Sequence, residues 1–343
     1  MKGRIENQFK TEKAIEQRIE NECPMLKPYY YSIDYMTHVS KKSYISFLIN
    51  FIKYCKNELK YSIETEQDCS VITKDDIARF IHDYGRKPDG SGVKSPKTID
   101  LAITILKAYF GYLTDDKEVM PKNPVTKIGR PQLPKKEEII ALTPEEIQQM
   151  FYNIDNTVGK FKYPSIRKKW KSRDRAFFAL LLTTGVRETA MFEANMEDLN
   201  LEEKWIELTD KGNKTRKYDL DDNALEILYR GLRTRKRILE GQETSYLFFS
   251  LKNGSPIRLD TSTMNSILKA YTEFTGKNIT CHKLRSTGGT LVYKSTKDIY
   301  KVADFLNHSN VATSQIYAKQ DEDNRKKAGK MIADIIVKRP DTV

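Results

Sequence analysis

Six side chains in the second half of this 343-residue sequence have types that suit chemistry on a negatively charged group. An arginine donates two parallel hydrogen bonds and keeps its proton, histidine and lysine can transfer protons, and a tyrosine phenol can act as a nucleophile. Taken singly, each is explained equally well as a packing residue, a helix-terminal cation or a solvated turn residue. The six are Arg187, Lys211, His282, Arg285, His308 and Tyr317.

The order and spacing of these residues are more informative than any one of them. Arg187 lies in TGVR, Lys211 in DKGNKTRK, His282 and Arg285 in HKLRSTGGT, and the last two in LNHSNVATSQIYA. The interval is 24 residues (211 − 187) between the first pair, 26 (308 − 282) between the histidines and nine (317 − 308) at the end. This pattern resembles the tyrosine site-specific recombinases, the family of phage integrases, Cre and the Xer proteins, and the resemblance spans most of the chain.

The resemblance implies a DNA recombinase or integrase of a mobile element, an enzyme that cleaves and rejoins strands through a 3′-phosphotyrosyl intermediate. Tyr317 would be the nucleophile and His282 would accept its proton, because a phenol with a pKa of about 10 is mostly protonated at pH 7. Lys211 would protonate the leaving 5′-oxygen, with Lys214 as the alternative. Because the bond energy is kept in the phosphotyrosyl link, no ATP is implied. Because guanidinium groups would supply the positive charge at the phosphate, no metal or other cofactor is implied either.

Fixed cations would stabilise the charge that builds up on the non-bridging oxygens in the transition state. The resemblance assigns this role to Arg187 and Arg285, aided by His308. Two alternatives share parts of this interpretation. A type IB topoisomerase-like enzyme uses the same nicking and closing chemistry without joining specific sites, and a catalytically silent accessory protein would bind DNA with the same fold.

The sequence departs from the usual family pattern near three of these residues. The glutamate usually found three residues after the first arginine is replaced by Ala190, and Glu188 follows that arginine directly. Asn307 stands where glycine usually precedes the second histidine, and asparagine tolerates the left-handed conformation of such a helix end. The pair Gly288 and Gly289 is expected to soften the helix that carries His282.

The elements that must position these residues are predicted to be mainly helices with a small β-sheet, in the two-domain architecture of the tyrosine recombinases. Thr73 and Thr143 begin helices with capping boxes, and Ser95 caps a third helix. A β-hairpin over 205–220 places Lys211 near its tip, and residues 245–250 are a further strand candidate. The predicted segments are an N-terminal extension (1–35), a helical core-binding, DNA-binding domain (36–124), a linker (125–141), a catalytic domain (142–322) and an amphipathic C-terminal helix (323–343).

The charge balance points to a nucleic acid partner. There are 59 Lys and Arg residues against 47 Asp and Glu, a formal net charge of +12, which attracts polyanions. The resemblance implies that this partner is double-stranded DNA with specific recombination sites, bound by a homotetramer. The amphipathic C-terminal helix is the candidate for exchange between subunits. The candidates for DNA contact are Lys94, Lys97, Arg167, Lys168, Lys169, Lys214, Arg216, Arg233 and Arg235.

Cysteine usage and hydropathy bear on the compartment. The four cysteines have no metal-ligand spacing and are expected to be reduced thiols. No stretch of about 18 apolar residues and no apolar signal region occur, so a cytoplasmic, nucleoid-associated protein without a membrane span is expected.

Overall fold

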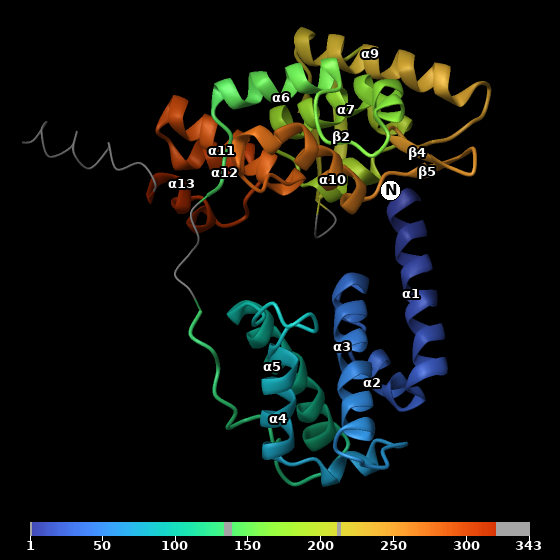
Figure 1. The fold of residues 1–343 in the computed structure, drawn as a ribbon, viewed down its shortest axis with the longest axis vertical. Coiled ribbons are helices and arrows are strands. Elements are labelled where there is room, and N and C mark those ends of the chain that lie inside the picture. The colour runs from blue at the N-terminus through green and yellow to red at the C-terminus, as the bar shows by residue number, and fades with distance from the viewer. Residues whose placement is uncertain (1, 134–138, 211–213, 320–343) are drawn as a thin grey trace, which may run out of the picture. The chain divides into compact units, whose positions relative to one another are not determined.

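The computed structural model of this protein describes residues 2–133, 139–210 and 214–319. The chain divides into two compact units, residues 1–135 and 136–343 (Figure 1). Both are built mainly from helices, and two small antiparallel sheets lie in the second unit, which confirms the predicted fold class. Over the described ranges, no helix combines the length and the hydropathy that crossing a bilayer requires.

Over its described residues, 2–133, the first unit is helical apart from one isolated antiparallel bridge between Arg86 and Val93. Threonine and serine side chains start its helices as predicted: Thr73 forms a capping box with Asp76, and Ser95 accepts a hydrogen bond from the Thr98 amide. Its elements are α1 (Lys2–Glu22), η1 (Pro24–Leu26), α2 (Lys27–Ser32), α3 (His38–Asn57), η2 (Gln67–Val71), α4 (Lys74–Gly85), α5 (Pro96–Gly111) and the short π-helix η3 (Tyr112–Asp116).

Part of the segment expected to be an N-terminal extension packs into the core of this unit. Ile19, Leu26 and Tyr29 are almost completely buried, in the same cluster as Leu48 of α3. The Tyr29 ring meets the ring of Tyr109 edge-on, with centroids 5.0 Å apart. The sequence pattern did not reveal that this segment contributes to the core, because the apolar stripe of α1 is only one residue wide and lies among charged residues. The residues that pack against the stripe show its role.

The second unit combines helices with the two small sheets. Thr143 begins α6 with the predicted capping box to Glu146. The helical elements are α6 (Pro144–Asn156), α7 (Pro164–Thr184), α8 (Glu188–Glu193), η4 (Met196–Asp198), α9 (Asp222–Leu239), α10 (Thr261–Thr272), η5 (Glu273–Thr275), α11 (Cys281–Thr296), α12 (Ile299–Phe305), η6 (Val311–Thr313) and α13 (Gln315–Lys319).

The first sheet has the order β1-β2-β3 and contains the predicted hairpin. Strands β1 (Leu199–Asn200), β2 (Trp205–Asp210) and β3 (Lys214–Asp219) pair antiparallel, with Trp205 opposite Asp219 and Asp210 opposite Lys214. Alternate residues of β2 point inward, so Asp210 is buried on the same face as Ile206 and Leu208. The strand candidate at 245–250 is only partly strand: β4 (Phe249–Lys252) pairs with β5 (Ser255–Arg258) in a separate sheet.

Candidate active site

Arg187 lies in the tight connection between α7 and α8. Gly185 ends α7 with a φ of +61°, and a Cβ on this glycine would come within 2.5 Å of the Phe305 ring, so the connection requires glycine. The Arg187 guanidinium donates a hydrogen bond of 2.6 Å to the carboxylate of Asp210 at the end of β2. The carboxylate is only 2% exposed and the arginine 32% exposed. The buried Asp210 carboxylate therefore holds the Arg187 guanidinium from the protein side, while part of the arginine side chain stays exposed to a ligand.

Helix α11 presents four of the relevant residues on one face. His282, Arg285, Ser286 and Gly289 are spaced i, i+3, i+4 and i+7, which places them along one side of the helix. The Arg285 side chain is buried and donates to two backbone carbonyls, those of Gly185 and Leu306. These two bonds fix the guanidinium between the α7–α8 connection and the end of α12.

The charges of the two arginines influence each other. Burial, and after it the charge of Arg187, lower the pKa of Arg285, while Asp210 opposes the change. Arginine starts from so high a pKa that it remains a cation at pH 7. The site therefore concentrates two fixed positive charges, partly neutralised by one buried carboxylate.

His308 follows a helix end of the predicted kind. Asn307 has a φ of 47°, the left-handed conformation expected from its type, and it directs the chain out of α12. The His308 ring places Nδ1 2.9 Å from the hydroxyl of Ser314, which is fully buried. Burial, and then the positive charges of Arg285 and Arg187, lower the pKa of His308 to about 4, so the ring is neutral at pH 7.

Tyr317 lies on α13 and packs against α11 within the same subunit. Its side chain is 8% exposed and belongs to a small apolar cluster with Tyr293, Val302 and Leu306. Burial raises the pKa of Tyr317, whereas contact with the Ser286 hydroxyl and the charge of Arg285 act in the opposite direction. The phenol therefore lies beside the Ser286 hydroxyl of α11, within range of the Arg285 charge.

The paired glycines of α11 allow this close approach. A Cβ on Gly289 would lie 3.0 Å from the Tyr317 hydroxyl, and a Cβ on Gly288 would lie 2.9 Å from the Leu182 carbonyl oxygen. Helix α11 continues through both residues. The small size of the two glycines lets α7 and α13 pack directly onto the backbone of α11, a role that the sequence pattern did not indicate.

One predicted catalytic residue and one predicted helix lie outside the described residues. Lys211 falls between the end of β2 at Asp210 and the start of β3 at Lys214, and the predicted C-terminal helix over 323–343 follows α13. The hairpin is joined to α12, because Arg216 on β3 donates a hydrogen bond of 2.6 Å to the backbone carbonyl of Asp304. Among the side chains in the described ranges, no group of three or more His, Cys, Asp or Glu could hold a metal ion.

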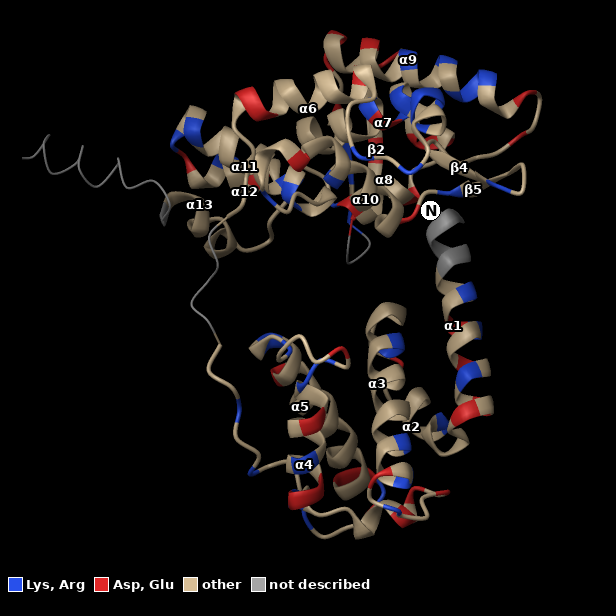
Figure 2. Cartoon of the chain, viewed as in Figure 1, with Lys and Arg blue, Asp and Glu red and all other residues tan. Residues whose placement is uncertain are grey.

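The candidates for DNA contact fall into two groups. Five of them, Lys97, Lys168, Lys169, Lys214 and Arg233, are exposed. Charged residues recur along α9 (Figure 2). Three others are less exposed and have partners within the protein. Lys94 lies over the Tyr84 ring, Arg216 binds Asp304, and Arg235 donates to the carbonyls of Thr244 and Tyr246.

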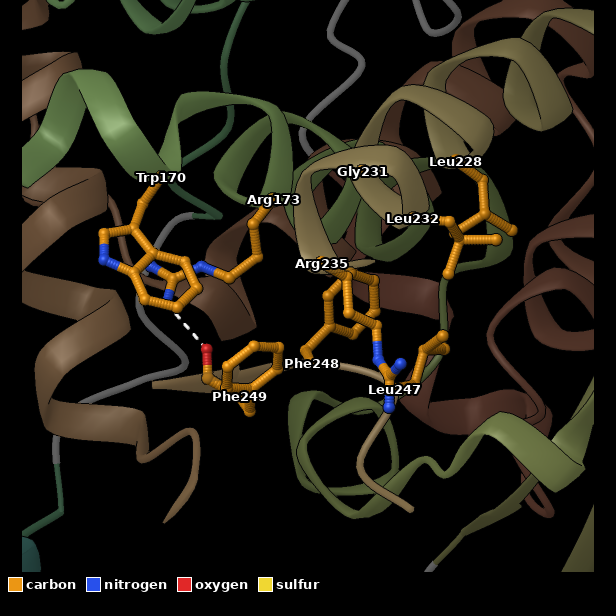
Figure 3. A pocket seen from close by; sticks show the side chains of 9 residues that line it. All are labelled: Trp170, Arg173, Leu228, Gly231, Leu232, Arg235, Leu247, Phe248 and Phe249. Atoms are coloured by element: carbon orange, nitrogen blue, oxygen red, sulfur yellow. Dashed lines mark hydrogen bonds between the residues drawn. The ribbon is translucent and has the colours of Figure 1, made fainter. Parts of the chain in front are cut away.

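The basic run over 167–175 is largely structural. Asp174 is fully buried and accepts hydrogen bonds from both Arg167 and Arg173. Figure 3 shows Arg173 beside the Trp170 ring, with a 2.9 Å hydrogen bond to the Phe249 carbonyl. A buried arginine needs such partners, since an uncompensated charge in the interior is costly.

Three residues of the site were not among the predicted site residues. They are Asp210, which pairs with Arg187, Glu188, whose carboxylate lies 3.3 Å from Nδ1 of His282, and Ser314, which contacts His308. The inward register of β2 was a signal for Asp210, because a carboxylate on the apolar face of a strand needs a cation. For Ser314 the sequence carried no signal.

The sequence of this chain is similar to those of known tyrosine recombinases. A model of the phage integrase family matches residues 141–324. The tyrosine recombinase XerS of Streptococcus pneumoniae (strain P1031) is 30% identical over 254 residues, which cover 68% of this chain and 70% of that protein. XerS of Streptococcus gordonii is 29% identical over 283 residues, covering 75% and 78%.

Two solved structures have a similar fold. XerH site-specific recombinase bound to a palindromic difH substrate, in a post-cleavage complex, has a TM-score of 0.64 at 20% identity and covers 94% of this chain and 89% of that one. A lambda integrase (75–356) dimer bound to a COC′ core site has a TM-score of 0.58 at 16% identity, covering 86% and 94%.

Proposed function

This chain belongs to the phage integrase family of tyrosine recombinases, and we propose that Arg187, Lys211, His282, Arg285, His308 and Tyr317 form its strand-cleavage site. The chain is an enzyme of site-specific DNA recombination, which cleaves and rejoins DNA strands. The observation that best supports the assignment is the packing of Tyr317 against Gly289, on the face of α11 that also carries His282 and Arg285.

In the proposed mechanism the scissile phosphate binds between the two arginines. Arg187 uses the donors that Asp210 leaves open, and Arg285 is already oriented by the carbonyls of Gly185 and Leu306. His308 is neutral, so it offers one N–H donor. When the Ser314 hydroxyl donates to its Nδ1, the proton stays on Nε2 and can bind a non-bridging oxygen. Preorganised donors of this kind each contribute on the order of 10²–10³ in rate.

The chemical step exchanges one ester for another. The Tyr317 oxygen forms a bond to phosphorus, the bond from phosphorus to the 5′-oxygen breaks, and the strand stays attached through a 3′-phosphotyrosyl link. The phenol proton passes to His282, directly or through the phosphate, and Lys211 supplies a proton to the leaving oxygen. Attack by the 5′-hydroxyl of another strand reverses the step and completes recombination.

We further propose how the chain engages its substrate. XerH and lambda integrase were solved bound to DNA sites, and by analogy this chain would bind double-stranded recombination sites. The helical first unit would contact DNA alongside the catalytic unit, with the linker over 125–141 between them. Two duplexes must be cut in register, so a homotetramer with exchange of the segment 323–343 is the expected assembly. The exposed lysines Lys168 and Lys169 would contact phosphates without reading sequence.

The test is covalent trapping on nicked DNA. A randomised duplex pool is incubated with the protein, and denatured adducts are recovered. An enriched sequence supplies a nicked substrate, from which the short fragment carrying the freed 5′-hydroxyl diffuses away after cleavage. Wild type and Tyr300→Phe should form the adduct, since Tyr300 is an exposed tyrosine of α12. Tyr317→Phe should form none. An adduct with Tyr317→Phe would overturn the assignment of the nucleophile, and a pool without enrichment would contradict site-specific action.

A further inference from the structure

Glu188 lies next to the first arginine of the site and contacts the first histidine. Its Oε2 atom is 3.3 Å from Nδ1 of His282. The Glu188 side chain is 20% exposed and the His282 side chain 63% exposed, so the carboxylate lies on the inner side of the ring. Much of the ring is therefore open to solvent.

The contact joins two elements that already carry the phosphate-binding arginines. Arg187 is the N-cap of α8 and Glu188 is its first residue, while His282 lies in the first turn of α11, one turn before Arg285. Residue 190, where the family usually has an acid, is a buried alanine in this chain. The carboxylate that reaches His282 therefore comes from a different position of the same short helix.

The ionisation of Glu188 decides whether the proton in its contact with His282 lies on the carboxylate or on Nδ1 of the ring. Burial acts to raise its pKa, but the hydrogen bond to His282, a backbone hydrogen bond and the charge of Arg285 lower it overall. Glu188 is thus ionised at pH 7 and can only accept hydrogen bonds. The proton in the contact must be on Nδ1 of His282, which leaves the lone pair of Nε2 free in the neutral ring.

We propose that Glu188 is a positioning residue that orients His282 and holds it in the tautomer with Nδ1 protonated. This inference rests on the proposed role of His282 as the proton acceptor of Tyr317. Only in that tautomer can Nε2 take the phenol proton, and the carboxylate then stabilises the imidazolium that forms. Glu188 itself touches neither the phosphate nor the nucleophile.

The test compares Glu188→Gln, Glu188→Asp and His282→Gln in single-turnover cleavage of the nicked substrate. Glu226→Gln is the matched control, because Glu226 is an exposed acid paired with Arg230 on α9. Glu188→Gln should slow adduct formation about 10- to 100-fold. This is the loss that follows when a metal-ligating histidine loses the group that orients it. Glu188→Asp should retain more of the rate, and the control should match wild type. Because His282 acts only through its proton, the double variant Glu188→Gln, His282→Gln should be no slower than His282→Gln alone.

A second readout separates positioning from a structural role. Nitrogen-15 NMR of the imidazole should show Nδ1 protonated in the wild type and a mixture of tautomers in Glu188→Gln, with melting temperature and DNA affinity unchanged. A full cleavage rate in Glu188→Gln, or a reduced rate with an unchanged tautomer, would overturn the inference. If His282→Gln also cleaves at the wild-type rate, the proposed role of His282 fails as well, so the two failures are distinguishable. Should Glu188→Gln be unstable, Glu188→Asp takes its place in both measurements, and a mixture of tautomers with a wild-type cleavage rate would refute the inference.

Discussion

Replacing Gly289 with alanine should slow formation of the phosphotyrosyl link while leaving DNA binding intact. The added methyl group would lie 3.0 Å from both Cζ and the hydroxyl oxygen of Tyr317, and 2.8 Å from a methyl carbon of Leu306. Carbon atoms pack at about 3.5–4.0 Å, so the tyrosine must move by about 0.5–1 Å to make room. A misplacement of about 1 Å can cost about 100-fold in rate, which sets the expected loss at about 10- to 100-fold.

The effect on stability should be small, because two contributions oppose each other. Overpacking a core costs about 1–3 kcal/mol. Alanine is about 1 kcal/mol more favourable than glycine inside a helix. The free energy of unfolding should therefore fall by about 0–2 kcal/mol, too little to unfold the second unit near 25 °C.

The chain supplies a matched control in Gly231→Ala. Gly231 is also inside a helix, α9, and its added Cβ would lie 2.9 Å from Cβ of Ala176 on α7. The steric conflict and the gain in helix propensity are the same, but Tyr317 is not involved. Both variants should shift the melting temperature similarly, and only Gly289→Ala should slow single-turnover adduct formation. A wild-type rate for Gly289→Ala, or equal slowing by both variants, would refute the packing argument.

Three further predictions concern the supporting structure. Asp174→Ala leaves two arginines without their buried partner and should lower the free energy of unfolding by about 3–5 kcal/mol in urea denaturation, against at most about 1 kcal/mol for Asp155→Ala at the surface. The pKa of His308 is about 4 in the folded state and near its usual 6.5 when unfolded. The unfolded state thus binds the proton first, and stability should fall as the pH drops from about 6.5 to about 4, a component that His308→Asn removes. Arg216→Ala removes the hydrogen bond from the hairpin to Asp304 and should slow cleavage. A substrate with a bridging 5′-phosphorothiolate should restore the rate, because a thiolate leaves without needing a proton. Failure of this rescue would contradict a role for the hairpin in protonating the leaving group.

Much of the local structure could be predicted because it depends on residues within one helical turn. Thr73, Ser95 and Thr143 each cap a helix through a backbone amide three residues away. Asn307 adopts the left-handed conformation that its short polar side chain favours. The family followed from the order of a few residue types, because the chemistry of a phosphodiester limits which side chains can serve.

Other features could not be predicted because they depend on partners far away in the sequence. Lys168 and Arg173 belong to the same basic run, yet the first is exposed and the second is paired with a buried carboxylate. Glycine at 289 looks like a flexible point in a helix until Tyr317 is seen to pack against it.

The sequence by itself determined the helices, the hairpin, the family and the residue types available for catalysis, since these are set by short-range conformational preference and by chemistry. Only the tertiary structure decided how the side chains are held: the carbonyls of residues 185 and 306 fix Arg285, Asp210 holds Arg187, and Glu188 reaches His282. The reason is that burial turns each uncompensated charge or donor into a cost of several kcal/mol, and folding alone determines which distant group relieves it.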